Sequence, residues 1–114
     1  MLNTISLQDL NDIELVPQAI LKKPLSFFHG TLGIKFVRAC DDLDEYEGAA
    51  LSLNTGLKFV LRHYAGYPED TTTIYLPRSC ERVDEITRII GRILEELNLS
   101  RDSISWERTN DPTL

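Results

Sequence analysis

Apolar and polar positions alternate along the middle of the chain, in four runs joined by short turns. In the first run, GIKFVRA, Ile34 and Phe36 share one face, because successive side chains of a strand point to opposite sides of a sheet. The same alternation recurs in AALSL, LKFVLRHY and TTTIYL. The intervening NTG and AGYPED contain the Asn, Gly and Pro residues that tight turns use. The pattern predicts a four-stranded antiparallel meander over residues 33–76.

A helical period follows the last of these runs. Its apolar positions are Val83, Ile86, Ile89, Ile90, Ile93, Leu94 and Leu97. They form a stripe that is broad enough to cover a sheet, and Ser79 precedes them as an expected N-cap. Asp84 and Arg88 are expected to pair on the exposed side of the helix. The sequence therefore predicts one long amphipathic helix over residues 80–98.

The N-terminal segment, residues 1–32, is expected to be helix and loop. Leu7, Leu10 and Ile13 fall at helical spacing. Pro17 interrupts that pattern, which favours two short pieces over one long helix.

The predicted elements combine into a single α+β domain spanning residues 1–114. The four-stranded antiparallel meander is packed by the long C-terminal amphipathic helix, because one face of the sheet is apolar and the helical stripe is its natural cover. Residues 103–107 are expected to add a short last strand, and residues 109–114 to form a tail.

Composition and cysteine spacing limit the class of protein. A chain of 114 residues with 42% hydrophobic residues supports one ordinary core. Cys40 and Cys80 are far apart in the sequence, without the short Cys/His spacing of a zinc site or the cysteine density of a secreted disulfide scaffold. The first residues lack the pattern of a signal peptide, and no stretch is long and apolar enough to span a membrane. We therefore expect a reduced, cytoplasmic protein with no membrane contact, no metal and no cofactor.

Negative charge is concentrated in one short stretch, CDDLDEYEG. The net charge of the chain is −6, and residues 41–48 carry five acids and no base. A calcium loop needs an oxygen ligand at its fifth position and Glu at its twelfth, whereas counting from Asp42 places Tyr46 and Leu53 there. The acids are Asp41, Asp42, Asp44, Glu45 and Glu47. We expect them on an exposed connection between the first two strands, either as a solvated loop or as a patch that docks a basic partner.

The second face of the predicted sheet combines basic side chains with tyrosines. Its candidate binding residues are Lys58, Arg62, Tyr64 and Tyr75. Single-stranded nucleic-acid readers use such faces for stacking and phosphate contact. The predicted strand order lacks the split βαββαβ pattern of those modules, and the net charge has the wrong sign. We therefore expect this face to be covered by the N-terminal segment or to form a homodimer.

A small enzyme is a further hypothesis. His63 with Cys40 or Cys80 would supply a base and a nucleophile. A thiol at a helix N-terminus has a lowered pKa, which singles out Cys80. His63 belongs to an otherwise apolar strand face, where a histidine at the edge of the core is the simpler interpretation. No catalytic residue is assigned.

Charge and the lack of a coherent active-site motif favour a small, acidic, non-catalytic protein-binding domain. Its most concrete form is an immunity- or antitoxin-like neutraliser that docks on a basic effector, because complementary charge speeds encounter and blocks a basic cleft. A single-stranded nucleic-acid-binding sheet is the first alternative, and a small enzyme is the second.

Overall fold

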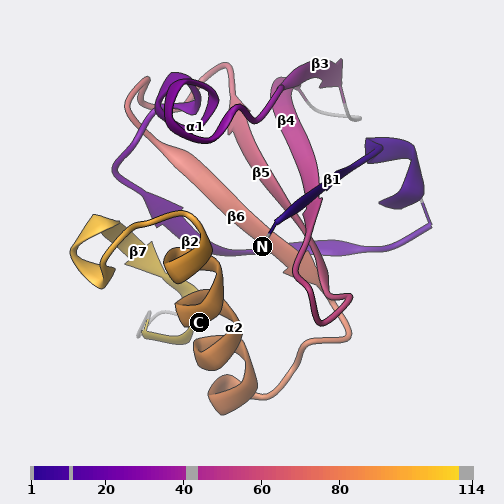
Figure 1. The fold of residues 1–114 in the computed structure, drawn as a ribbon, viewed down its shortest axis with the longest axis vertical. Coiled ribbons are helices and arrows are strands. Elements are labelled where there is room, and N and C mark those ends of the chain that lie inside the picture. The colour runs from indigo at the N-terminus through magenta and orange to yellow at the C-terminus, as the bar shows by residue number, and fades with distance from the viewer. Residues whose placement is uncertain (1, 11, 41–43, 111–114) are drawn as a thin grey trace.

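The chain folds around one antiparallel sheet in a computed structural model that describes residues 2–10, 12–40 and 44–110 (Figure 1). The strands of the described residues are β1 (Asn3–Ile5), β2 (Leu15–Leu21), β3 (Val37–Cys40), β4 (Glu45–Ser52), β5 (Lys58–Tyr64), β6 (Thr72–Pro77) and β7 (Ile104–Glu107). The helices are α1 (Leu25–Leu32) and α2 (Val83–Glu96), with short 3-10 turns η1 (Leu7–Leu10), η2 (Arg101–Ser103) and η3 (Arg108–Asn110). The fold is mostly sheet, so the prediction of a four-stranded meander packed by one long helix is wrong.

The sheet has the strand order β1-β4-β5-β6-β2-β7, and β3 also pairs with β4. β1 pairs with residues 50–52 of β4, and β3 pairs with residues 45–48 of the same strand. These two short strands therefore lie end to end along one edge of β4, while β5 occupies its other edge. β3, β4, β5 and β6 do pair in succession, but they are only part of a larger sheet that also includes β1, β2 and β7.

The N-terminal segment differs most from the prediction. Residues 1–32 were expected to be helix and loop, yet β1 and β2 belong to the sheet and the apolar spacing around Leu10 forms only the single turn η1. Pro17 does not break β2, because the β2–β6 register shifts between Pro17 and Ala19, and β7 pairs with β2 only from Ala19 onward. Proline is tolerated at such bulges and at unpaired strand edges.

Part of the acidic stretch is strand rather than connection. β4 begins at Glu45, so Glu45 and Glu47 are paired with β3 on one side, and Glu47 is also paired with β5 on the other. The expectation of an exposed loop is therefore wrong for these two residues. Asp41 and Asp42 lie outside the described residues.

The helix α2 lies where the long C-terminal helix was predicted. Its buried residues are Ile86, Ile90, Ile93 and Leu94. Arg82 precedes its first turn and donates a hydrogen bond to Oδ2 of Asp84 at 3.1 Å. Asp84 therefore does not pair with Arg88, and Ser79 is not the N-cap. Apolar packing, rather than a cap or this pair, holds the helix.

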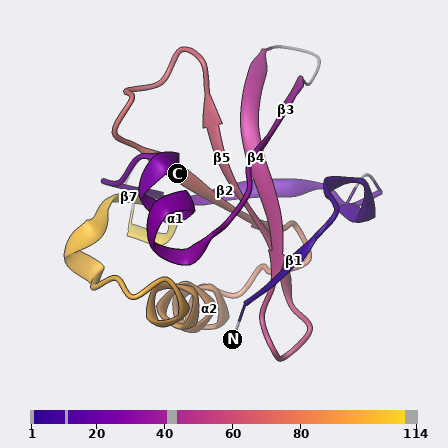
Figure 2. The same ribbon diagram turned by 45° about the horizontal axis from the view of Figure 1, so that its top comes forward.

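The sheet is packed on both faces. The first face carries the main core, to which α1 contributes Phe28 and α2 contributes Ile90. On the second face Leu10 of η1 packs with Val60 and Tyr75. Figure 2 shows α1 and α2 on one side of the sheet and the turn that follows β1 on the other. The N-terminal segment thus covers part of the second face, which was one of the two arrangements expected for it.

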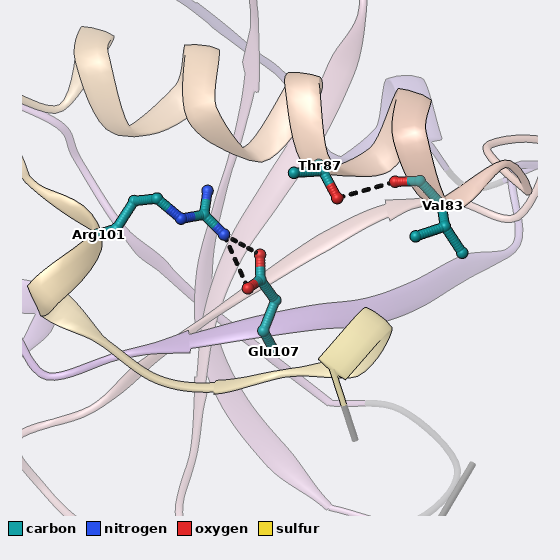
Figure 3. A network of polar contacts seen from close by, with 4 residues as sticks. All are labelled: Val83, Thr87, Arg101 and Glu107. Atoms are coloured by element: carbon teal, nitrogen blue, oxygen red, sulfur yellow. Dashed lines mark hydrogen bonds and ion pairs between the residues drawn. The ribbon is translucent and has the colours of Figure 1, made fainter. Parts of the chain in front are cut away.

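An ion pair between the largely buried Glu107 and Arg101 lies at the C-terminal end of the sheet. Glu107, the last residue of β7, has a side chain that is 7% exposed. Its two carboxylate oxygens accept hydrogen bonds from Nη2 of Arg101 at 2.5 and 2.8 Å. Figure 3 shows this pair with the Thr87–Val83 hydrogen bond of α2. Because a buried carboxylate is stable only when it is paired, this contact anchors η2 to β7.

Candidate functional site

The second face of the sheet presents tyrosines around one arginine. Register places Tyr46 of β4 and Arg62 and Tyr64 of β5 on this face, with Tyr75 of β6, since facing residues of paired strands project to the same side. Tyr67 lies in the connection between β5 and β6 and contacts Tyr64. We refer to Tyr46, Arg62, Tyr64 and Tyr67 as the tyrosine–arginine face.

These side chains form a continuous stack. Cζ of Arg62 lies 4.4 Å from the ring centroid of Tyr46 and 4.9 Å from that of Tyr75, which is the range of cation–π contacts. The ring centroid of Tyr64 is 5.2 Å from that of Tyr46 and 5.7 Å from that of Tyr67. Tyr75 is buried and Tyr67 is exposed. Between them, Arg62, Tyr46 and Tyr64 are half-buried. The stack therefore runs from the core to solvent.

Gly48 makes the close packing of this stack possible. It faces Arg62 across the β4–β5 ladder. A Cβ atom at Gly48 would lie 3.1 Å from Cγ of Arg62 and 3.3 Å from Cε2 of Tyr46, closer than ordinary van der Waals contact. The missing side chain leaves room for the arginine stem and the tyrosine ring to lie against the strand.

The positive charge of Arg62 is not neutralised by any acid within the described part of the chain. Its Nη1 donates to Oη of Tyr64 over a long 3.4 Å, and its buried Nε has no hydrogen-bond partner among the residues that the structure describes. A guanidinium offers five N–H donors, and charges removed from water are normally paired. Arg62 is therefore poised to bind an acceptor that the described residues do not supply.

A cavity of about 400 Å³ opens between η1 and this face. Leu7, Leu10, Ile13 and Val60 contribute apolar walls, and Tyr46 and Arg62 border it as polar groups. Gln8 and Cys40 line it too, so the cavity joins an apolar wall to a larger polar surface, and cavities that combine apolar walls with convergent polar groups are the usual form of small-molecule sites.

Two described acids of the predicted docking patch, Glu45 and Glu47, lie on the other side of the same strand. Glu45 and Glu47 alternate with Tyr46 along β4, so they project to the first face, and both are exposed. Asp44 immediately precedes β4, and its Oδ1 accepts a hydrogen bond from N of Glu45 at 2.8 Å. Strand alternation thus separates the carboxylates of Glu45 and Glu47 from the tyrosines by the thickness of one sheet.

The residues predicted for the second face do not form one patch. Arg62 and Tyr64 belong to the tyrosine–arginine face, whereas Tyr75 is only 8% exposed. Lys58 pairs with Ser52 at the opposite end of β5, about 13 Å of strand from Arg62. Within the predicted set, one basic side chain remains beside the tyrosines.

The structure does not bring His63 together with either cysteine. β4 lies between Cys40 in β3 and His63 in β5, so two strand spacings, about 10 Å, separate their backbones. Nδ1 of His63 donates to O of Thr71 at 2.9 Å. Cys80 belongs to the main core, where burial and then the charge of Glu85 raise the pKa of its thiol. The expectation of a lowered pKa at Cys80 is wrong.

The described residues form neither a metal-ligand cluster nor a membrane-spanning helix. Across residues 2–10, 12–40 and 44–110, no three His, Cys, Asp or Glu side chains gather closely enough to hold a metal ion. None of the helices formed by those residues has the length and apolar character needed to cross a membrane.

Tyr46 and Tyr67 belong to the tyrosine–arginine face but were not predicted from the sequence. The acid density of CDDLDEYEG hides Tyr46, although the alternation in EYEGAALS places Tyr46, Gly48 and Ala50 on one side. Tyr67 lies in a turn, and nothing in the turn sequence signals its contact with Tyr64.

Comparison of the chain with protein-family models, curated proteins and solved structures finds no match. The site is therefore characterised by its own geometry, namely a stacked aromatic group, the half-buried Arg62 and the adjoining cavity.

Proposed function

We propose that the protein is a small, acidic, non-catalytic protein-binding domain whose tyrosine–arginine face contacts the partner. The observation that carries the proposal is the stack itself, half-buried at Tyr46 and Arg62 and exposed at Tyr67. Tyrosine and arginine are enriched in binding hot spots. Rings that are already stacked also lose little conformational freedom on binding, so this surface is organised before a partner arrives.

Negative charge beside the face favours a basic partner. The net charge is −6, and Glu45 and Glu47 project from the strand that carries Tyr46. They point to the other side of the sheet, but screening at physiological salt acts over about 8 Å, so their field still reaches a partner at this strand. Complementary charge raises association rates. An immunity- or antitoxin-like neutraliser of a basic effector is the most specific form of the proposal.

Single-stranded nucleic acid fits this surface less well. The tyrosine rings could stack on bases, but Arg62 is the one cation of the face and already contacts two tyrosine rings. Lys58 lies at the far end of its strand. The net charge of −6 also disfavours contact with a phosphate backbone.

The test uses the whole chain as immobilised bait for an extract of the source cells, with captured proteins quantified by mass spectrometry. The baits are the wild type, Tyr64→Ala, Lys58→Ala, and an amide variant of the acidic stretch in which Asp41, Asp42, Asp44 and Glu45 become the corresponding amides. The captured partner is then purified, and its binding kinetics are measured at several salt concentrations.

We expect Tyr64→Ala to weaken binding at least about tenfold, since a truncated hot-spot aromatic costs about 2 kcal/mol. The amide variant of the acidic stretch should lower the association rate and its salt dependence, while the exposed control Lys58→Ala should bind like the wild type. A partner that binds Tyr64→Ala as tightly as the wild type would refute the role of the face. Saturable binding of a labelled oligothymidine at low salt, lost in Tyr64→Ala, would assign the face to nucleic acid instead.

A further inference from the structure

We infer that the cavity between η1 and the sheet binds an apolar carboxylate, with the carboxylate on Arg62 and the apolar part against Leu7, Leu10 and Ile13. Tyr46 and Arg62 border both this cavity and the surface proposed for a protein partner. The small ligand nevertheless requires no protein partner, so the two proposals can fail separately.

The shape and lining of the cavity suit a small molecule. Its volume of about 400 Å³ leaves room for roughly 10–20 non-hydrogen atoms, as in small-ligand sites. Val60 and Leu10 are buried at 0% and 4% exposure and form a fixed wall. Leu7 and Ile13 are half-buried, so an apolar ligand would remove further apolar surface from water.

Arg62 supplies the charge at one side of this cavity. Its guanidinium is held between Tyr46 and Tyr75, and in the described residues it has one long hydrogen bond and no ion pair. A carboxylate matches the planar guanidinium fork and can accept two hydrogen bonds from it. The ligand would thus provide the acceptor that this half-buried cation lacks.

A monoanion fits better than a phosphate. Arg62 is the one cation among the residues that line the cavity, and the chain as a whole carries −6. A second negative charge on the ligand would meet no second cation there, so its desolvation would not be offset. The shared chemistry is therefore an apolar carboxylate, either a free acid or the C-terminus of a chain that ends in an apolar residue.

Calorimetric titration of the whole chain with octanoate and with 3-phenylpropionate tests the inference. We expect a dissociation constant of about 0.1–1 mM, which is typical for about ten ligand atoms. The uncharged octanamide should bind at least about tenfold more weakly, because it lacks the charge that pairs with Arg62. Amide NMR shifts should map binding to Leu10 and Val60.

Two variants remove the site in different ways. Arg62→Met removes the charge and keeps an unbranched side chain between the tyrosines, whereas Ala39→Phe fills the cavity from its half-buried wall and keeps Arg62. Each should weaken octanoate binding at least about tenfold. Arg88→Met, which removes an exposed arginine of α2, is the matched control and should bind like the wild type.

A dileucine peptide with a free or an amidated C-terminus distinguishes the two ligand sources. Tighter binding of the free peptide than of either acid would assign the site to chain termini, and the reverse would assign it to small acids. The inference is overturned if neither acid nor the free peptide produces heat or amide shifts, if octanamide binds as tightly as octanoate, or if both Arg62→Met and Ala39→Phe bind octanoate normally.

Discussion

Arg62 occupies a position where a cation would ordinarily be costly, and its neighbours reduce that cost. Two tyrosine rings lie against its guanidinium, and the negative face of an aromatic ring partly replaces the water that the charge has lost. The absence of a side chain at Gly48 lets the arginine stem lie on β4. The residues therefore hold Arg62 in place while leaving its hydrogen-bonding capacity unfilled.

Gly48→Ala is expected to lower the free energy of unfolding by about 1–2 kcal/mol. The new Cβ would lie 3.2 Å from O of Leu61 as well as 3.1 Å from Cγ of Arg62, and a backbone carbonyl within a ladder cannot move aside. Urea denaturation measures the effect.

Gly91→Ala is the matched control for that substitution. Gly91 lies inside α2, and a Cβ atom there would meet nothing within 4 Å. Alanine should therefore stabilise the protein by about 0.5–1 kcal/mol through helix propensity. If both substitutions change the free energy of unfolding in the same direction, crowding around a Cβ atom does not explain why glycine occupies position 48.

At the scale of elements, β4 organises both sides of the molecule. It pairs with β1, β3 and β5, and its alternation sends Glu45 and Glu47 to one face and Tyr46 to the other. A single strand thus presents negative charge on one side and a stacked aromatic on the opposite side. A slip of one residue in its register would exchange the two sets.

Arg101→Met is expected to lower the free energy of unfolding by about 1–3 kcal/mol, because it removes a charged hydrogen-bond donor from the largely buried Glu107 carboxylate. Thermal and urea unfolding measure the loss. Adding Glu107→Leu should recover most of it, since the buried charge is then gone.

Arg78→Met is the comparison for Arg101→Met, because it removes an exposed ion pair instead of one with a buried acid. The Arg78–Glu14 pair has a length of 2.7 Å, but its side chains are 68% and 67% exposed. Its loss should cost less than about 1 kcal/mol, as for exposed ion pairs generally. Equal losses for Arg78→Met and Arg101→Met would show that the burial of Glu107 is unimportant.

At the scale of the whole molecule, the sheet has a core on each face rather than one. Helices cover the first face, and the N-terminal segment closes part of the second, where Leu10 meets Val60 and Tyr75. The rest of the second face carries the tyrosine–arginine face, and the cavity lies where this face meets the N-terminal segment.

Leu10→Asp is expected to detach the N-terminal segment and to increase self-association. Leu10 is 4% exposed, and a carboxylate cannot be buried there without a partner, so the apolar surface of Val60 would open to solvent and to other copies. Sedimentation velocity over a range of concentrations measures the association. Gln8→Asp makes a similar charge change at an exposed neighbour and should leave the association state as in the wild type. Identical behaviour of the two variants would contradict the covering role of Leu10.

Patterns that depend on neighbours along the chain were readable from the sequence. The period of apolar residues places α2, because a helix buries one stripe whatever it packs against. Strand alternation likewise places Phe59 and Leu61 on the core face and Arg62 and Tyr64 on the other. The charge of the acidic stretch is also a property of the sequence alone.

The pairing of strands and the contacts between their side chains depend on the tertiary fold. Pro17 looks like a breaker locally, and the bulge against β6 makes it part of a strand. The period of two along β5 is enough to predict that Arg62 faces away from the core. It could not determine that Tyr46 and Tyr75 enclose Arg62 or that Leu10 helps to wall the cavity. Those contacts join separate strands, and alternation specifies a face without specifying the strand that lies beside it.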